Sequence, residues 1–123
     1  MSGEVQTLPS QLQEQLQKLQ QLQQTLQLIV SQNQQVELEL SETDKALSEI
    51  EKIAVKAVIY KSIGAILVES KRNKVVNELK ERKDLLNTRV TVLTRQQKRI
   101  EARVKELQKS IQERIRQLPT RQV

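Results

Sequence analysis

The 123-residue sequence contains no Cys and no His. Their absence excludes disulfides, thiol nucleophiles and Cys/His metal sites, and it removes the side chain most often used for proton transfer near neutral pH. A Gly-rich phosphate-binding loop is also missing, because Gly3 and Gly64 are the only glycines. We therefore expect no enzyme, no metal and no cofactor, and a protein that acts by binding other proteins.

Aromatic residues are nearly absent, since Phe and Trp do not occur and Tyr60 stands alone. A compact core draws much of its buried area from aromatic rings, so burial here must come from Leu, Ile and Val. Two Gly and two Pro leave the backbone few places to turn. A chain of this length holds one domain, and the composition predicts an elongated one.

Long hydrophobic runs are missing as well. No stretch of 18 apolar residues occurs, and the N-terminus lacks a basic region followed by an apolar one. We therefore expect no membrane span and no secretion signal. The lack of Cys fits a reducing compartment, so the expected location is cytoplasmic.

The formal net charge of +6 hides an asymmetry between the two halves. Residues 1–57 carry four Lys or Arg against eight Asp or Glu, whereas residues 58–123 carry seventeen against seven. Two antiparallel arms with these charges would attract each other modestly. The second half holds a basic run: Arg95, Lys98, Arg99, Arg103, Lys105 and Lys109. Such a run is usually a solvated helix face; it could bind an acidic protein, but interrupting glutamates and missing aromatics argue against nucleic acid.

The first half predicts one long helix over about residues 9–52. Pro9, Ser10 and Gln13 have the spacing of a helix start with a capping box. Two interleaved seven-residue series follow, and nine of their twelve positions are apolar: Leu12, Leu19, Leu26, Asn33, Leu40 and Leu47, with Gln15, Leu22, Ile29, Val36, Thr43 and Ile50. Thirteen Gln between residues 6 and 35 could indicate disorder, but the leucine spacing and the helix propensity of Gln favour the helix.

A β-hairpin is predicted over about residues 57–70, where charges thin out and β-branched residues gather. Gly64 and Ala65 form the predicted loop, which pairs Ile63 with Ile66, Lys61 with Val68 and Ile59 with Ser70. One face is then mostly apolar, with Ile59, Ile63, Ile66 and Val68, and the other carries Val58, Tyr60 and Leu67. A buried helix is the alternative, but Gly64 and the β-branched residues weigh against it.

An isolated hairpin is marginally stable in water, and this one has apolar residues on both faces. We therefore expect it to assemble with hairpins from other chains. The alternative is that it folds back onto the adjacent helix ends.

A second helix is predicted over about residues 71–118, capped by Ser70 or Asn73 and ended by Pro119. Its two series are Leu79, Leu86, Leu93, Ile100, Leu107 and Arg114, with Val76, Lys83, Val90, Gln97, Val104, Ile111 and Leu118. Two helices of similar length, each with one apolar seam, predict an intramolecular antiparallel coiled coil with frayed termini. Asn33 within the seam is expected to fix the register.

A second apolar group lies where both helices have their free ends. Leu8 and Leu16 fall off the seam near the start of the first helix, and Ile115 falls off it near the end of the second. Together with three seam residues they form what we call the end cluster: Leu8, Leu12, Leu16, Ile111, Ile115 and Leu118. This cluster is either a plug that prevents fraying or a surface that captures apolar segments of another protein.

The hairpin also carries a family resemblance. Its segment Val58–Val68, VIYKSIGAILV, resembles the Tyr-Lys-x-Val-Gly-x-Leu-Leu-Val stretch of β-class prefoldin subunits, with Ile63 in place of Val and Ile66 in place of Leu or Val. The segments Gln34–Leu40 and Val76–Glu81 also fit. The resemblance extends from about Leu12 to Leu118, and the single hairpin matches the β class because α-class chains carry two.

The resemblance implies a mainly α fold whose single β-hairpin oligomerises into a β-barrel platform. It implies a hetero-hexamer of two α-class and four β-class prefoldin subunits, which acts as an ATP-independent holdase chaperone. Unfolded client proteins would be held at the distal tips and passed to a group II chaperonin, with no nucleic acid and no membrane involved. The absence of Cys and the short chain suggest an archaeal subunit.

Carried onto this sequence, the resemblance gives the end cluster the capture role. It gives the platform role to what we call the hairpin set: Val58, Ile59, Tyr60, Ile63, Gly64, Ile66, Leu67 and Val68. A coiled-coil scaffold or filament protein without client binding is the alternative function. A nucleic-acid-binding arm is a third.

Overall fold

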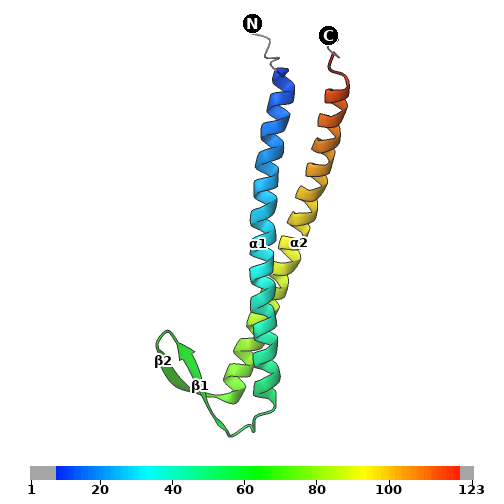
Figure 1. The fold of residues 1–123 in the computed structure, drawn as a ribbon. Coiled ribbons are helices and arrows are strands. Elements are labelled where there is room, and N and C mark those ends of the chain that lie inside the picture. The colour runs from blue at the N-terminus through cyan, green and yellow to red at the C-terminus, as the bar shows by residue number, and fades with distance from the viewer. Residues whose placement is uncertain (1–7, 120–123) are drawn as a thin grey trace. The chain divides into compact units, whose positions relative to one another are not determined.

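The computed structural model describes residues 8–119, which form two long helices joined by a two-stranded hairpin (Figure 1). The order is α1 (Ser10–Glu51), β1 (Val58–Ile63), β2 (Ile66–Lys71) and α2 (Arg72–Arg116). With 42 and 45 residues in the helices, the chain is mainly helical, which confirms the predicted fold class. The termini predicted to be frayed lie largely outside the described residues.

The chain divides into two compact units, and each is described by itself. Within the described residues, unit 1 comprises 8–31 and 95–119, and unit 2 comprises Gln32–Thr94. The first part of α1 and the last part of α2 therefore belong to unit 1. Unit 2 holds the remaining parts of both helices and the whole hairpin.

Helix α1 begins directly after Pro9, whose lack of an N–H is harmless at a helix start. The first helical hydrogen bond runs from the Gln13 N–H to the Pro9 carbonyl at 3.0 Å. The Gln13 side-chain Nε2 donates to the Leu8 carbonyl at 2.9 Å. Gln13 therefore reaches back past Ser10, in place of the capping box that its spacing predicts.

The helical seam follows the predicted seven-residue series. Every predicted seam position of both helices is buried or partly buried in its unit, including the polar Asn33 and Thr43. Most positions between them are exposed, so each helix presents one apolar stripe to its neighbour. This result confirms the register read from the leucine spacing.

Hydrogen bonds between side chains join the two helices in each unit. In unit 1 the Gln15 side-chain Nε2 donates to Ser110 Oγ at 3.0 Å, and in unit 2 Asn33 Nδ2 donates to Thr94 Oγ1 at 3.3 Å. A buried polar group is costly unless it is hydrogen-bonded, so these contacts favour one alignment of the helices. That Asn33 fixes the alignment of the two helices along the seam stays a prediction.

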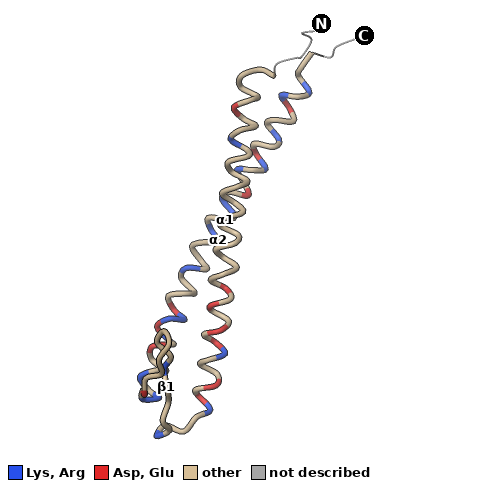
Figure 2. Tube along the Cα trace, turned by 60° about the vertical axis from the view of Figure 1, so that its left-hand side comes forward, with Lys and Arg blue, Asp and Glu red and all other residues tan. Residues whose placement is uncertain are grey.

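Ion pairs between the helices occur in unit 2. Arg82 lies 3.7 Å from Glu39, and Lys83 Nζ lies 2.9 Å from Asp44 Oδ1. The hydrogen bond to Asp44, with the attraction of its charge, holds the pKa of Lys83 above its usual value. Within the described part of unit 1, no ion pair joins the helices. Figure 2 shows why: the first half of α1 carries almost no charged positions.

The hairpin has the predicted register, with Ile63 opposite Ile66, Lys61 opposite Val68 and Ile59 opposite Ser70. Gly64 adopts a φ of 56°, which is the left-handed region that a Gly tolerates without cost from a Cβ. A two-residue loop with positive φ at its first position alone has the form of a type II′ turn. Gly64 therefore permits the tight reversal that sets this register.

The end of α1 is capped by Arg72, the first residue of α2. Arg72 Nε donates to the Ile50 carbonyl at 3.3 Å, and Nη2 donates to the Glu51 carbonyl at 3.2 Å. The last carbonyls of a helix lack intrahelical partners and carry partial negative charge, so a guanidinium there is favourable. Helix α2 begins at Arg72 directly after β2, so of the two predicted caps of the second helix Ser70 lies within β2 and Asn73 within α2.

Candidate protein-binding surfaces

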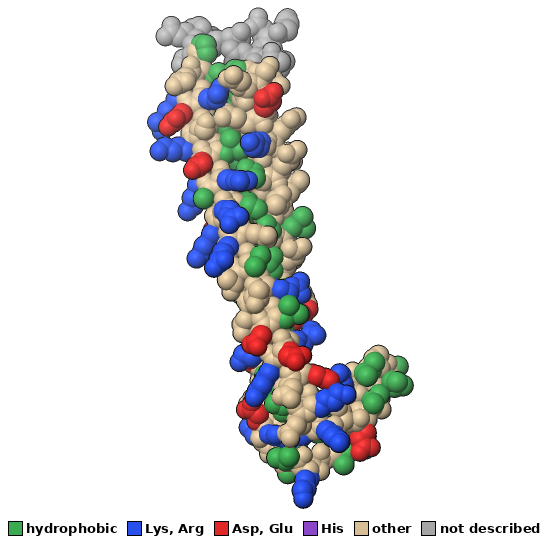
Figure 3. All heavy atoms as spheres, turned by 180° about the vertical axis from the view of Figure 1, so that it is seen from behind, with side chains coloured by type: hydrophobic (Ala, Val, Ile, Leu, Met, Phe, Trp, Pro, Cys, Tyr) green, Lys and Arg blue, Asp and Glu red, His purple; other side chains and the backbone are tan. Residues whose placement is uncertain are grey.

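The hairpin presents apolar side chains to solvent on both of its faces. Directly opposed residues share a face, so Ile63, Ile66 and Val68 lie on one face and Val58, Tyr60 and Leu67 on the other. All six are exposed, and Leu67 is the most exposed at 71%. Green side chains gather on the hairpin in Figure 3, at its lower right.

Two residues of β1, Ile59 and Lys61, anchor the hairpin to the helices of unit 2. Ile59 packs against a small core formed by Leu47, Ile50 and Val76. Lys61 Nζ lies 2.7 Å from Glu78 Oε2 on α2, and this hydrogen bond is the main reason why the pKa of Glu78 lies below its usual value. The alternative that the hairpin folds back onto the helix ends thus holds for Ile59 and Lys61. The rest of the hairpin set, including the Gly64 loop, extends away from this anchor.

A two-stranded sheet has two edges, and each edge displays backbone N–H and C=O groups without a strand partner. Exposed apolar side chains on both faces of such a sheet are the usual mark of a protein interface. The hairpin can therefore add strands from other chains at its edges and bury its faces in the same step.

The end cluster lies wholly in unit 1 and separates into two groups by burial. Leu12 and Ile111 are only 1% and 5% exposed and belong to the packed seam, and Leu118 is partly buried. Leu8, Leu16 and Ile115 are exposed. The two readings of this cluster thus apply to different residues: the buried group closes the seam, and the exposed group is accessible to another protein.

Polar contacts close the seam beside this cluster. Arg114 Nη1 donates to Gln11 Oε1. This contact lies one helical turn closer to the free ends of the helices than the hydrogen bond between Gln15 and Ser110. Both contacts lie between helix segments that would otherwise fray. The exposed apolar residues of the end cluster therefore lie where hydrogen bonds join α1 to α2.

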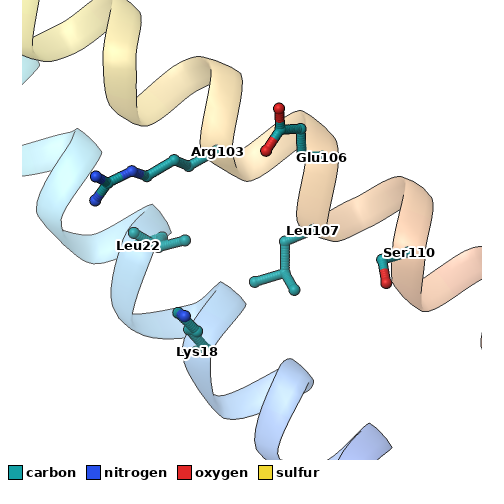
Figure 4. Close-up of a pocket in the computed structure, with 6 residues that line it drawn as sticks. All are labelled: Lys18, Leu22, Arg103, Glu106, Leu107 and Ser110. Atoms are coloured by element: carbon teal, nitrogen blue, oxygen red, sulfur yellow. The ribbon is translucent and has the colours of Figure 1, made fainter.

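Two adjoining grooves run along unit 1 between the helices. The first is lined by Lys18, Leu22, Arg103, Glu106, Leu107 and Ser110 (Figure 4). The second is lined by Ile29, Gln96, Arg99, Ile100 and Arg103, so the two meet at Arg103. In Figure 4, Leu22 and Leu107 face each other across the gap, and Arg103 extends from α2 toward α1.

The basic run found in the sequence thus contributes Arg99 and Arg103 to these grooves. Sequence reasoning gave the apolar floor residues as seam positions but missed Lys18 and the grooves, because a groove between two helices does not follow from a charge run on one of them. One feature of the sequence could have drawn attention to Lys18: it is the only basic residue before Lys45.

Other kinds of site receive no support from residues 8–119. No group of three or more acidic side chains in this range is arranged to hold a metal ion. Neither described helix has a stretch apolar enough, over the necessary length, to cross a membrane.

Comparison with known proteins identifies the family. A family model described as "Prefoldin subunit" matches residues 13–118. The chain belongs to the prefoldin subunit family. Prefoldin subunit beta of Thermococcus kodakarensis is 44% identical over 112 residues, covering 91% of this chain and 96% of that protein. Prefoldin subunit beta of Methanothrix thermoacetophila is 40% identical over 121 residues, covering 98% of both.

A solved structure agrees with this assignment. The crystal structure of the prefoldin beta subunit from Thermococcus strain KS-1 matches with a TM-score of 0.82 and 43% identity, covering 94% of this chain and 100% of that chain. The resemblance to β-class prefoldin subunits is thereby confirmed. Prefoldin subunits are chaperone subunits that form hetero-oligomers with other prefoldin subunits, so the exposed hairpin faces belong to a chain from an assembling family.

Proposed function

We propose that this chain is a subunit of an ATP-independent holdase chaperone, which captures non-native proteins at its end cluster and passes them to a group II chaperonin. The observation that carries the proposal is the hairpin: Ile59 and Lys61 anchor it to the helices, and its other apolar residues are exposed on both faces. This surface occurs in a chain 43% identical to an archaeal prefoldin beta subunit.

The hairpin set is the proposed site of assembly. Strand addition at its edges and burial of its faces would join it to hairpins of other subunits in a β-barrel platform. The proposed partner is an α-class prefoldin subunit, in a hetero-hexamer of two α-class and four β-class chains. In this arrangement residues 1–123 act as a single prefoldin-like domain.

The end cluster is the proposed site of client capture. Its exposed members, Leu8, Leu16 and Ile115, offer apolar area to a non-native protein, and the buried Leu12 and Ile111 support them. A contact made by three such side chains is weak. Several arms in one assembly would raise retention through effective concentration, and the client could still leave when a chaperonin competes.

The proposed activity requires no chemistry from this chain. Holding a client by apolar contact needs neither a nucleotide nor a catalytic group, and the sequence has no Cys, no His and no Gly-rich phosphate-binding motif. We propose a cytoplasmic, non-enzymatic role, in which transfer to the chaperonin follows from competition for the client.

A coiled-coil scaffold or filament is the second candidate, and the two free edges of the hairpin favour it. In that role identical hairpins would assemble without an α-class partner. The two functions differ in what the assembly contains and in whether it holds a client.

The test measures light scattering by a chemically denatured enzyme on dilution, without ATP, with this chain alone and with an archaeal α-class subunit. The mass of each assembly is measured in parallel by analytical ultracentrifugation. The holdase proposal predicts a mixed hexamer that lowers scattering more than either chain alone. Unchanged scattering beside a defined homo-oligomer of this chain would support the scaffold instead.

A further inference from the structure

The described part of unit 1 has an excess of positive charge that is not neutralised by ion pairs between its two helices. The described residues of unit 1 include nine Lys or Arg against four Asp or Glu, whereas unit 2 has eleven against ten. In unit 2 cationic side chains of α2 pair with Glu39 and Asp44 on α1. In the described part of unit 1, Glu14 is the one acidic residue of α1, and no ion pair crosses to it.

Part of this charge borders apolar surface. The two grooves that meet at Arg103 have Leu22, Ile29, Ile100 and Leu107 along their floor. Lys18 lies on the α1 side, and the exposed Arg99 and Arg103 lie on the α2 side. Figure 3 shows the same association on the surface, with a row of apolar side chains in the arm flanked by Lys and Arg.

The geometry points to an occupant of defined chemistry. We propose that the grooves between α1 and α2 in unit 1 bind extended segments of non-native proteins in which Leu, Ile or Val alternate with Asp or Glu. The inference rests on the proposed holdase function and deepens it, because it states which client segments unit 1 binds most tightly.

The length of the grooves sets the length of the segment. From Gln96 to Ser110 the grooves extend over about 21 Å, at 1.5 Å per helical residue. An extended chain covers that distance in about six residues. Alternate side chains of such a segment point to opposite sides, so apolar ones can contact the floor while acidic ones turn toward the cationic rims.

The lack of aromatic side chains favours this occupant over nucleic acid. The sequence has no aromatic residue other than Tyr60, which lies in the hairpin, so the grooves offer no platform on which bases could stack. The apolar floor, in contrast, matches aliphatic side chains.

The test uses the complex with an α-class subunit and three peptides with the same neutral dye, in which Leu alternates with Glu, Lys or Gln. Binding is measured by fluorescence anisotropy at low and high salt. The groove variant combines Lys18→Gln, Arg99→Gln and Arg103→Gln. The control variant combines Lys98→Gln, Lys105→Gln and Lys109→Gln, which removes three charges from the same unit but from residues that line neither groove.

We expect the Glu peptide to bind most tightly and the groove variant to bind it about tenfold more weakly at low salt, because several modest ion pairs are lost together. The control variant should lose much less, and high salt should reduce the difference. Equal losses in the two variants, or equal binding of the three peptides, would overturn the inference. Single-stranded oligo(dT) is tested as a competitor. If it displaces the Glu peptide, and its own binding is lost in the groove variant, the grooves are a nucleic-acid surface instead.

The scattering assay with an uncharged client separates this inference from the proposed function. If the wild-type complex protects that client while the three peptides bind equally, the holdase stands and the groove preference fails. If the complex protects no client, the proposed function fails, whatever the peptides do.

Discussion

Lys61 in β1 and Glu78 in α2 form an ion pair with 2.7 Å between Nζ and Oε2, and this pair ties the hairpin to the helix that follows it. Together with the packing of Ile59, it fixes the direction in which the hairpin leaves the helices of unit 2. Both contacts lie on one face of the hairpin, so the opposite face keeps its apolar residues exposed. The anchor thus leaves the proposed assembly surface uncovered.

The ion pair should make hairpin stability depend on pH. The pKa of Glu78 lies below its ordinary value of 4.5, chiefly because it accepts a hydrogen bond from Lys61. A lowered pKa in the folded state stabilises the fold above the unfolded-state value and loses this effect as pH falls through the folded-state value. We expect Lys61→Gln to lower the Tm slightly at neutral pH and to match wild type in strong acid. A Tm difference that grows on acidification would contradict this account, and Lys56→Gln is the control.

The two groups within the end cluster should differ in their effect on stability. Leu12 is 1% exposed, so Leu12→Ala removes packed methyl groups and should lower the free energy of unfolding by about 2–3 kcal/mol. Leu16 is 38% exposed, and Leu16→Ala should change it by less than about 0.5 kcal/mol. Urea unfolding followed by circular dichroism measures both. Similar losses would mean that Leu16 also packs in the seam.

Gly64 should be required for its backbone conformation alone. Its φ is +56°, and a Cβ built there would meet nothing within 4 Å. Gly64→Ala should therefore destabilise the hairpin by about 1 kcal/mol, without a steric clash. Gly64→Asn should cost less, because Asn tolerates this region. Protection of the hairpin amides in hydrogen exchange measures the difference, and equal protection in Gly64→Ala and wild type would contradict it.

Substitutions in the hairpin set should separate assembly from folding. Tyr60→Ser and Leu67→Ser remove exposed side chains, so we expect an unchanged helical melt but loss of the mixed complex with an α-class subunit. Ile59→Ala should instead lower the Tm, because Ile59 packs against the core of unit 2. Sedimentation of the mixed complex gives the assembly readout. A complex that survives loss of both Tyr60 and Leu67 would place the interface elsewhere.

Periodicity and turn chemistry made most of the fold predictable. The seven-residue series identified every buried seam position, because a helix that buries one stripe must repeat it at that spacing. The hairpin register followed from Gly64, since a two-residue loop leaves only one pairing for Ile63. The off-seam positions of Leu8, Leu16 and Ile115 likewise indicated their exposure.

Contacts between segments distant in sequence were not predictable. Arg72 at the start of α2 caps α1, and Lys61 in β1 forms an ion pair with Glu78 in α2. Both depend on how the hairpin joins the helices, and a side-chain pattern within one element does not encode this. The grooves around Arg103 were missed for the same reason, because Lys18 and Arg103 belong to different helices.

The most direct measurement concerns the exposed residues of the end cluster in the assembled complex. The variant combines Leu8→Gln, Leu16→Gln and Ile115→Gln, and the control combines Leu28→Gln, Leu38→Gln and Leu85→Gln, which removes three exposed apolar side chains elsewhere on the helices. Light scattering by a denatured client on dilution is followed without ATP, with the mass of each complex checked first. The account predicts that the end variant keeps the wild-type mass but loses most of its protection, while the control protects as wild type does. Full protection by the end variant would contradict capture at this cluster.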